Sequence, residues 1–234
     1  MHPTAKRNCT HFFDTYATAF QGRRAKVIEI GSQDVNGSLR DCCPAGFEYV
    51  GVDFVSGKGV DVVLEDPYSL PFATESADIV ISSSCFEHSE MFWVLFLEIL
   101  RILRPDGLFY LNVPSNGDFH QFPVDCWRFY PDSGRALVTW AGRNGLNAAL
   151  LESYTSAQSR TGDEVDDHWN DYVAVYVKDE SHAPKYPQRI LTGKQDCNNG
   201  LVLGSNDYVN YSPMPEDRRK LACIKHIVEN TLRV

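Results

Sequence analysis

The sequence predicts an α/β fold: a Rossmann-like, doubly wound, mostly parallel seven-stranded sheet with helices on both faces. Two observations support this prediction. Short apolar segments alternate with amphipathic segments between residue 11 and about residue 178, and strands that alternate with helices build βαβ units with right-handed crossovers. In addition, several apolar segments end in glycine, serine or acidic residues, and ligands of open α/β sheets bind beyond the carboxyl ends of the strands.

The expected strands are short apolar segments bounded by turn residues. In chain order they cover residues 26–30, 47–54, 60–64, 77–84, 108–113, 146–155 and 170–177. The expected helices cover residues 11–20, 38–43, 89–104, 132–145 and 215–232. The clearest helix has Ser89 as its N-cap, and the run Pro105-Asp106-Gly107 ends it.

The chain is expected to have two parts. Residues 1–178 form the main domain, and 234 residues leave room for an appendage beside one domain. From about residue 179 the composition shifts to proline, asparagine, glycine and lysine. We therefore expect residues 179–234 to form a C-terminal extension that ends in an amphipathic helix, with Pro215 in its first turn.

Composition limits the class of protein. The 31 acidic and 22 basic residues give a net charge of −9, which argues against a nucleic-acid or anionic-membrane partner. No run of 18 apolar residues and no signal-peptide pattern occurs, so a cytoplasmic protein is expected. The seven cysteines contain no CxxC pair and fit no zinc template; we expect reduced thiols and no metal site. A homodimer remains open.

Five motifs follow one another at the ends of the expected strands: "EIGSQ", "YVGVDF", "EDPYSLPF", "SADIVISSSCFEH" and "ILRPDGLFYLNVPS". In this order the chain resembles the class I S-adenosylmethionine (SAM)-dependent methyltransferases, specifically the group with E/D-x-G, a later acidic strand end, LPF, EH and L-R-P-G-G. The resemblance covers about residues 10 to 178. It implies that SAM is the cofactor and S-adenosylhomocysteine the product.

The resemblance also implies roles for single residues. Glu29, Gly31 and Ser32 would lie beside the methionine part of the cofactor, Asp53 would accept hydrogen bonds from the ribose hydroxyls, and Phe54 follows it. Asp66 would face the adenine amino group, with Pro67 and Leu70 near the ring. Ser83 and Ser84 would lie below the sulfonium, and Glu87 and His88 at the edge of the acceptor cavity. Alone, Leu70 and Phe72 would be core residues, and His88 a structural histidine.

The first loop departs from the family pattern. Where the family has glycines two and four residues after Gly31, this chain has Gln33 and Val35. Gln33 is a candidate donor to the carboxylate of the cofactor. The departure puts the course of this loop in doubt more than the fold.

The aromatic-rich loop after the fifth expected strand is the candidate acceptor site. Within 120–130 it holds His120, Asp125, Trp127, Arg128 and Tyr130, a mixture of base, carboxylate, guanidinium and stacking rings that suits a sugar or an anionic group. A lid held by its own aromatic cluster, with a plain Asp125–Arg128 ion pair, is the equal alternative. Similar "PVDxWRF" loops occur in methyltransferases of glycan synthesis, which favours O-methylation of a sugar or glycan precursor with His120, Asp125 or His88 as base.

Other interpretations stay open at this point. Some sugar methyltransferases bind a divalent metal, and ligands for Mg²⁺ or Mn²⁺ can be drawn from Asp125, Asp166, Asp167 and His168, but an exposed acidic turn is the simpler interpretation of "DEVDDHW". N-methylation of a small metabolite and a catalytically idle SAM-binding homologue are the alternatives in function. A nicotinamide-dependent oxidoreductase is disfavoured because G-x-G-x-x-G is missing.

Overall fold

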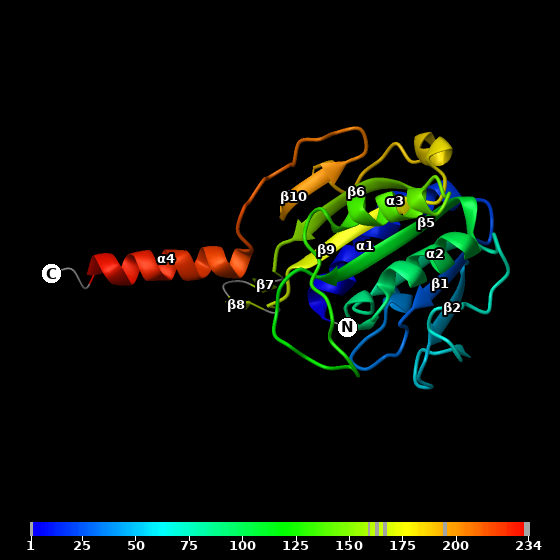
Figure 1. The fold of residues 1–234 in the computed structure, drawn as a ribbon, viewed down its shortest axis with the longest axis horizontal. Coiled ribbons are helices and arrows are strands. Elements are labelled where there is room, and N and C mark those ends of the chain that lie inside the picture. The colour runs from blue at the N-terminus through cyan, green and yellow to red at the C-terminus, as the bar shows by residue number, and fades with distance from the viewer. Residues whose placement is uncertain (1, 159, 162–163, 166–167, 194–195, 232–234) are drawn as a thin grey trace.

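The computed structural model describes residues 2–158, 160–161, 164–165, 168–193 and 196–231. It contains the predicted Rossmann-like sheet between helices (Figure 1). The described sheet has eight strands, one more than predicted. In spatial order they are β10 (Cys197–Val202), β6 (Ala149–Ser156), β9 (Asp171–Val177), β5 (Leu103–Pro114), β4 (Ala77–Ser83), β1 (Lys26–Ile30), β2 (Glu48–Asp53) and β3 (Val62–Val63).

Strand direction divides this sheet. The strands β1 to β5 pair in parallel, whereas β9, β6 and β10 pair antiparallel to their neighbours. The added strand β10 comes from the segment expected to be an extension. Two further short strands, β7 (Arg160–Thr161) and β8 (Glu164–Val165), form a separate hairpin.

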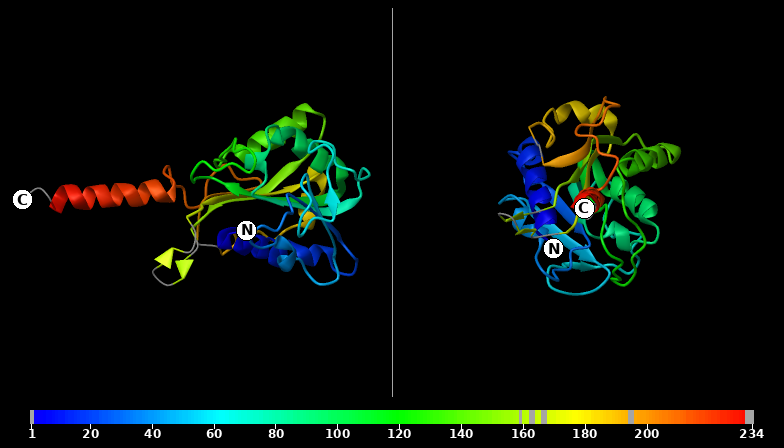
Figure 2. Two further views of the ribbon diagram at one scale, coloured as in Figure 1. Left: turned by 90° about the horizontal axis from the view of Figure 1, so that it is seen from below. Right: turned by 90° about the vertical axis from the view of Figure 1, so that its left-hand side faces the viewer.

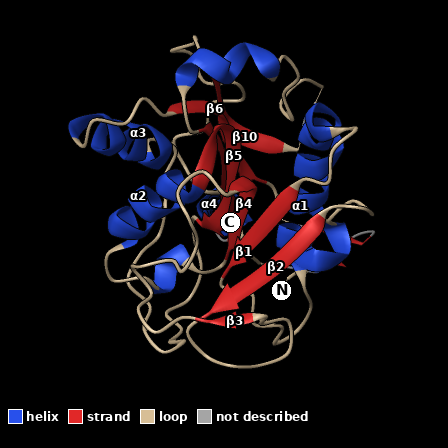
Figure 3. Ribbon diagram, turned by 90° about the vertical axis from the view of Figure 1, so that its right-hand side faces the viewer, coloured by secondary structure: helices blue, strands red, loops and turns tan. Residues whose placement is uncertain are grey.

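Apolar residues on both faces of the sheet explain the two helical layers. Every residue of β4 and of β9 is buried, as expected for central strands covered on both sides. Helix α1 (Pro3–Tyr16) covers one face, and α2 (Phe92–Ile102) and α3 (Ser133–Arg143) cover the other (Figure 3). The remaining turns of helix are η1 (Ala17–Phe20), η2 (Leu39–Cys42), η3 (Phe86–His88) and η4 (Glu180–Lys185).

Helix α2 is shorter than predicted at both ends. It begins at Phe92 with Met91, not Ser89, as its N-cap, and it ends at Ile102. Residues 103–107 belong instead to β5, where the pairing with β4 shifts between Ala77 and Ile79. The Pro105–Gly107 turn signal therefore marks an irregularity in the pairing at the start of β5 rather than the end of the helix.

The last helix, α4 (Glu216–Thr231), points away from the rest of the molecule (Figures 1 and 2). None of its residues is buried. Its first residue holds it to the body, because Glu216 accepts hydrogen bonds from the Gln158 amide and the Asn170 side chain. Among the described helices, none is both long and apolar enough to span a membrane.

One edge of the sheet gathers the polar residues. The strands β1, β2, β4 and β5 end there, and the antiparallel β9 begins there. The amino end of α1 reaches the same edge, since Asn8 donates to Asn112 of β5 at 3.0 Å. Residues from distant parts of the sequence therefore meet at this edge, where ligands of such sheets bind.

Candidate active site

The loop after β1 turns sharply at Gly31. Its φ of +80° lies in the left-handed region, and its amide, like that of Ser32, donates to the Val52 carbonyl. A Cβ on Gly31 would lie 2.7 Å from the Cβ of Cys85, which follows β4. The absence of a side chain therefore lets the loops after β1 and β4 touch.

Gln33 and Val35 stand where the family has glycines, and the loop takes a compact course there. The Asp34 amide donates to the Lys58 carbonyl, and the Asp34 carboxylate pairs with the Lys58 ammonium at 2.6 Å. The side chain of Gln33 lies against Gly57, whose added Cβ would be 2.9 Å from Nε2. Val35 is exposed. In this structure Gln33 therefore packs on the loop after β2.

Asp53, the last residue of β2, is buried and connects two loops. One carboxylate oxygen accepts from the Gln33 amide at 3.1 Å, and the other accepts from the Val55 amide at 3.2 Å. A carboxylate offers about four lone-pair sites, so two remain for ribose hydroxyls. Phe54 beside it is exposed.

Glu29, in β1, lies against Tyr49 of the neighbouring strand β2. It is 2% exposed and accepts a 2.6 Å hydrogen bond from the Tyr49 hydroxyl. Burial raises the pKa of Glu29 to about 7, although the hydrogen bond from Tyr49 opposes the shift. The described contacts thus place Glu29 against β2, and its place beside the methionine part of the cofactor stays a prediction.

The segment after β3 is divided between surface and core. Asp66 and Pro67 are exposed, and Asp66 accepts from the Tyr68 amide at 2.8 Å. Leu70 is buried in the apolar core, and Phe72 is half-buried against it. In this structure the two apolar residues of the LPF motif pack in the core, while Asp66 and Pro67 stay open to a ligand.

Ser83 and Ser84 lie at the end of β4 beside a buried polar group. Ser83 accepts from the Asn112 side chain at 3.2 Å, and the Ser84 amide donates to the Asn112 carbonyl. Ser84 has a φ of +51°, which is uncommon for a residue with a side chain. This strained turn aims the two serines at the carboxyl edge.

Unpartnered polar atoms mark this edge as a place for a polar ligand. The buried hydroxyls of Ser32 and Ser84 and one carboxylate oxygen of Glu87 have no hydrogen-bond partner among the described residues. Buried polar groups are normally paired, because burying them unpaired costs free energy. Their positions after β1 and β4 fit a cofactor that supplies hydroxyl, amino and carboxylate groups.

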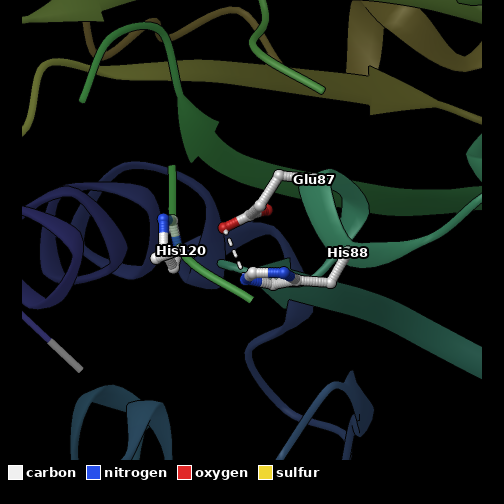
Figure 4. A group of neighbouring side chains, drawn as sticks. All are labelled: Glu87, His88 and His120. Carbon is white, nitrogen blue, oxygen red and sulfur yellow. Dashed lines mark ion pairs between the residues drawn. The ribbon is translucent and has the colours of Figure 1, made fainter. Parts of the chain in front are cut away.

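The structure brings three predicted residues together. One ligand atom from each of Glu87, His88 and His120 lies within 4.8 Å of the others (Figure 4). Burial raises the pKa of Glu87 to about 8 and lowers the pKa of His88. The rings of His88 and His120 meet edge to face, with centroids 5.0 Å apart.

Asp125 and Arg128 form the ion pair that the sequence left as an alternative. The guanidinium donates to both carboxylate oxygens, at 2.6 and 2.9 Å. This pairing holds the pKa of Asp125 down at about 2, so the carboxylate is a weak base. Since its best donors are already engaged, the Arg128 guanidinium is poorly placed to bind an anionic acceptor.

The two remaining aromatic candidates do not join this cluster. Trp127 packs edge to face against Phe92 and Trp93 of α2 and donates to the Ser89 carbonyl. Tyr130 is 59% exposed. Trp127 therefore fixes the loop to α2, and Tyr130 is accessible at the surface.

A buried polar network at the same edge was not predicted from the sequence. Asn112 donates to Asp171 at 3.0 Å, and the Asp171 amide donates to Ser156. His2 lies 3.8 Å from the Asp171 carboxylate. An asparagine within the apolar run "LFYLNV" was the available signal. Of the other possible metal ligands, His168 is exposed, and Asp166 and Asp167 lie outside the described residues.

Comparisons with known proteins agree with this geometry. The model of a methyltransferase domain family matches residues 34–111. The phthiotriol/phenolphthiotriol dimycocerosates methyltransferase of Mycobacterium leprae (strain TN) is 30% identical over 140 residues, which is 58% of this chain and 45% of the relative. The chain thus spans about half the length of the curated relatives it matches.

Solved structures with this fold include a Burkholderia thailandensis 1,6-didemethyltoxoflavin-N1-methyltransferase, with S-adenosylhomocysteine bound. It is 16% identical, with a TM-score of 0.52 over 75% of this chain and 79% of that chain. The [4+2]-cyclase SpnF is 12% identical, with a TM-score of 0.51 over 74% of this chain and 86% of that chain. At these identities the likeness shows the fold alone, and the family model covers about a third of the chain. Residues 34–111 therefore match a methyltransferase domain family, and the chain has the fold of the class I SAM-dependent methyltransferases, enzymes whose methyl donor is SAM and whose product is S-adenosylhomocysteine.

Proposed function

We propose that this chain transfers the methyl group of SAM to a hydroxyl of a small polar acceptor, in the first place a sugar or a glycan precursor. The single observation that carries the proposal is the cluster of Glu87, His88 and His120 at the carboxyl edge of the sheet. A sugar hydroxyl is a weak nucleophile, so its proton must be removed or weakened during transfer. A cluster of two imidazoles and a carboxylate can do this.

The hydrogen bonds of the two imidazoles favour His120 as the base. His88 Nδ1 lies 2.5 Å from the Val124 carbonyl, and His120 Nδ1 lies 3.0 Å from the Asp118 carbonyl. A carbonyl only accepts, so both Nδ1 atoms carry hydrogen and both Nε2 atoms keep a free lone pair. His120 is the more exposed of the two and can meet an acceptor.

Asp125 has a positioning role in this proposal. Its carboxylate accepts from the His120 amide at 2.8 Å while it pairs with Arg128. It therefore orders the segment that carries His120 rather than taking a proton itself. The exposed rings of Phe119, Phe122 and Tyr130 on the same loop offer stacking surfaces for a sugar ring.

A hydroxylated lipid is the second candidate acceptor. The Mycobacterium leprae relative is named as a methyltransferase of phthiotriol and phenolphthiotriol dimycocerosates, a name that specifies a triol. The polar cluster favours the smaller and more polar acceptor, and the exposed aromatic residues suit either. Both candidates predict O-methylation; an amine acceptor would need less help from a base.

Two measurements test the proposal. Calorimetric titration should show binding of S-adenosylhomocysteine and none of NAD. Incubation with SAM and a panel of sugars, nucleotide sugars, hydroxylated lipids and amines should then give a product heavier by one methyl group. Methylation of amines only would contradict O-methylation, and cofactor binding without any product would support the idle homologue instead.

A further inference from the structure

We propose that Glu87, His88 and His120 bind a Zn²⁺ ion at the acceptor side of the site. The three side chains supply one carboxylate and two imidazoles (Figure 4). Two histidines and one glutamate are a donor set of catalytic zinc sites, which keep a further position open for water or substrate. Oxygen-preferring ions such as Mg²⁺ suit this donor set poorly.

The orientation of the histidines is the first argument. Each Nδ1 is engaged by a backbone carbonyl, of Val124 for His88 and of Asp118 for His120. In addition, Asp125 Oδ2 lies 3.5 Å from His120 Nδ1. Metal-binding histidines generally donate their other ring N–H to a carbonyl or carboxylate, which fixes the tautomer and aims the free nitrogen at the ion. Both rings are held in this way.

The carboxylate is the second and independent argument. Glu87 is 1% exposed, and its Oε2 has no hydrogen-bond partner among the described residues. Its Oε1 lies 3.7 Å from His88 Nε2, too far for a hydrogen bond. A buried carboxyl group that lacks a close partner is costly to ionise, and a cation between it and the imidazoles would stabilise the carboxylate.

The distances allow an ion after a small movement. Zinc bonds of about 2.0–2.1 Å in a tetrahedron place neighbouring ligand atoms about 3.3 Å apart. Glu87 and His88 at 3.7 Å are already close to this separation. From the 4.8 Å limit of the cluster His120 must approach by at most about 1.5 Å, and its side chain is 40% exposed on a loop.

The positive charge of Arg128 does not prevent binding. Its Nη2 lies 3.4 Å from His120 Nδ1, but the Asp125 carboxylate neutralises it through two hydrogen bonds. No sequence spacing indicates this site, because His120 is distant in the chain from the adjacent Glu87 and His88. Only the fold of the loop brings the third ligand in.

The proposed zinc site does not depend on the proposed methylation, whereas the role that we give to the ion does. With the Nε2 lone pair of His120 bound to it, a Zn²⁺ ion would replace this histidine as the group that activates the acceptor, because the ion would lower the pKa of an acceptor hydroxyl that binds to its open position. The acceptor oxygen would release its proton to solvent and form a bond to the methyl carbon while the carbon–sulfur bond of the sulfonium breaks, and the electron pair of that bond would remain on the sulfur of S-adenosylhomocysteine. Zinc binding without methylation, or methylation without zinc, would separate the two proposals.

Titration of the chelator-treated full chain with Zn²⁺ tests the site by calorimetry. We expect one Zn²⁺ per chain, and about a 100-fold or greater loss of affinity in His120→Ala and in Glu87→Gln. Titration with Co²⁺ should give visible absorption that both substitutions abolish, while Mg²⁺ should not compete. Circular dichroism of each variant checks that it is folded.

Two matched variants test whether residues outside the proposed site bind the Zn²⁺ ion. His226→Ala removes an exposed histidine of α4, and Cys42→Ser removes a thiol that accepts from the Thr10 hydroxyl; both should bind Zn²⁺ like the original chain. Loss of binding in Cys42→Ser with retention in folded His120→Ala would overturn the proposal. Absence of Zn²⁺ binding by the original chain would overturn it as well.

Discussion

Asp125 and Arg128 face each other across one turn of the acceptor loop, and two hydrogen bonds of 2.6 and 2.9 Å join them. The Asp125 side chain is 2% exposed and that of Arg128 is 21% exposed. The pair therefore orders the loop from within, while its outer side meets solvent. Removing one partner leaves the other with an uncompensated charge.

We expect Asp125→Asn to destabilise the protein by about 1–3 kcal/mol, less than for a fully buried pair because Arg128 is partly solvated. Urea unfolding measures this change. The matched control is Asp41→Asn, which removes the exposed ion pair with Lys6 and should leave the unfolding midpoint unchanged. Equal effects of the two substitutions would contradict an ordering role for Asp125.

Replacement of Asp53 tests the cofactor site. Asp53→Asn keeps the shape of the side chain but removes a charge and part of the accepting capacity, so S-adenosylhomocysteine should bind at least about tenfold more weakly. Calorimetry measures the dissociation constant. Glu48→Gln at the opposite end of β2, with its exposed side chain, should bind normally. Unchanged affinity in Asp53→Asn would remove this residue from the ribose site.

The positions of some site residues can be predicted from the sequence, because polar residues that directly follow a parallel strand must lie at the carboxyl edge of the sheet. Glu87 and His88 follow β4 and are placed at that edge by the strand alone. His120 is not, because nothing local fixes the path of the loop that carries it. The contacts of Asn112 could not be predicted either, because one polar residue in an apolar strand gives no indication of its partners, Asn8 and Asp171. Strand direction is also not apparent from the sequence, so the antiparallel pairing of β9, β6 and β10 was not predicted.

Substitution at Gly31 tests the contact between the loops after β1 and β4. Gly31→Ala adds a Cβ that meets Cys85 at 2.7 Å and also strains a φ of +80°. Gly145→Ala is a matched control, because its φ is +77° but nothing lies within 4 Å of the added Cβ. Strain alone should cost Gly145→Ala about 1 kcal/mol, and the clash should cost Gly31→Ala roughly 2 kcal/mol more.

Chemical denaturation of the two alanine variants measures both free energies of unfolding. Gly31→Ala should also weaken the binding of S-adenosylhomocysteine, since the loop beside the cofactor must shift, whereas Gly145→Ala should bind it normally. If the two variants lost the same stability, the close approach of Cys85 would have no energetic weight.

The buried Glu29 carboxyl should make the stability of the protein depend on pH. Its pKa is raised from 4.5 to about 7 by burial, so between these values the folded protein holds a proton that the unfolded chain has released. Stability therefore falls as the pH rises from 4.5 to about 7 and is constant above that range. The part due to Glu29 is at most about 3 kcal/mol.

Glu29→Gln should remove this part, because a neutral amide does not titrate and its oxygen still accepts from the Tyr49 hydroxyl. The difference in unfolding free energy between the variant and the original chain should therefore shift in favour of the variant as the pH rises from 4.5 to 7. Glu48→Gln, at a half-buried position of the neighbouring strand, is the matched control over the same range. A constant difference for Glu29→Gln would mean that the Glu29 carboxyl is ionised throughout, and that hydrogen bonding rather than burial decides its protonation.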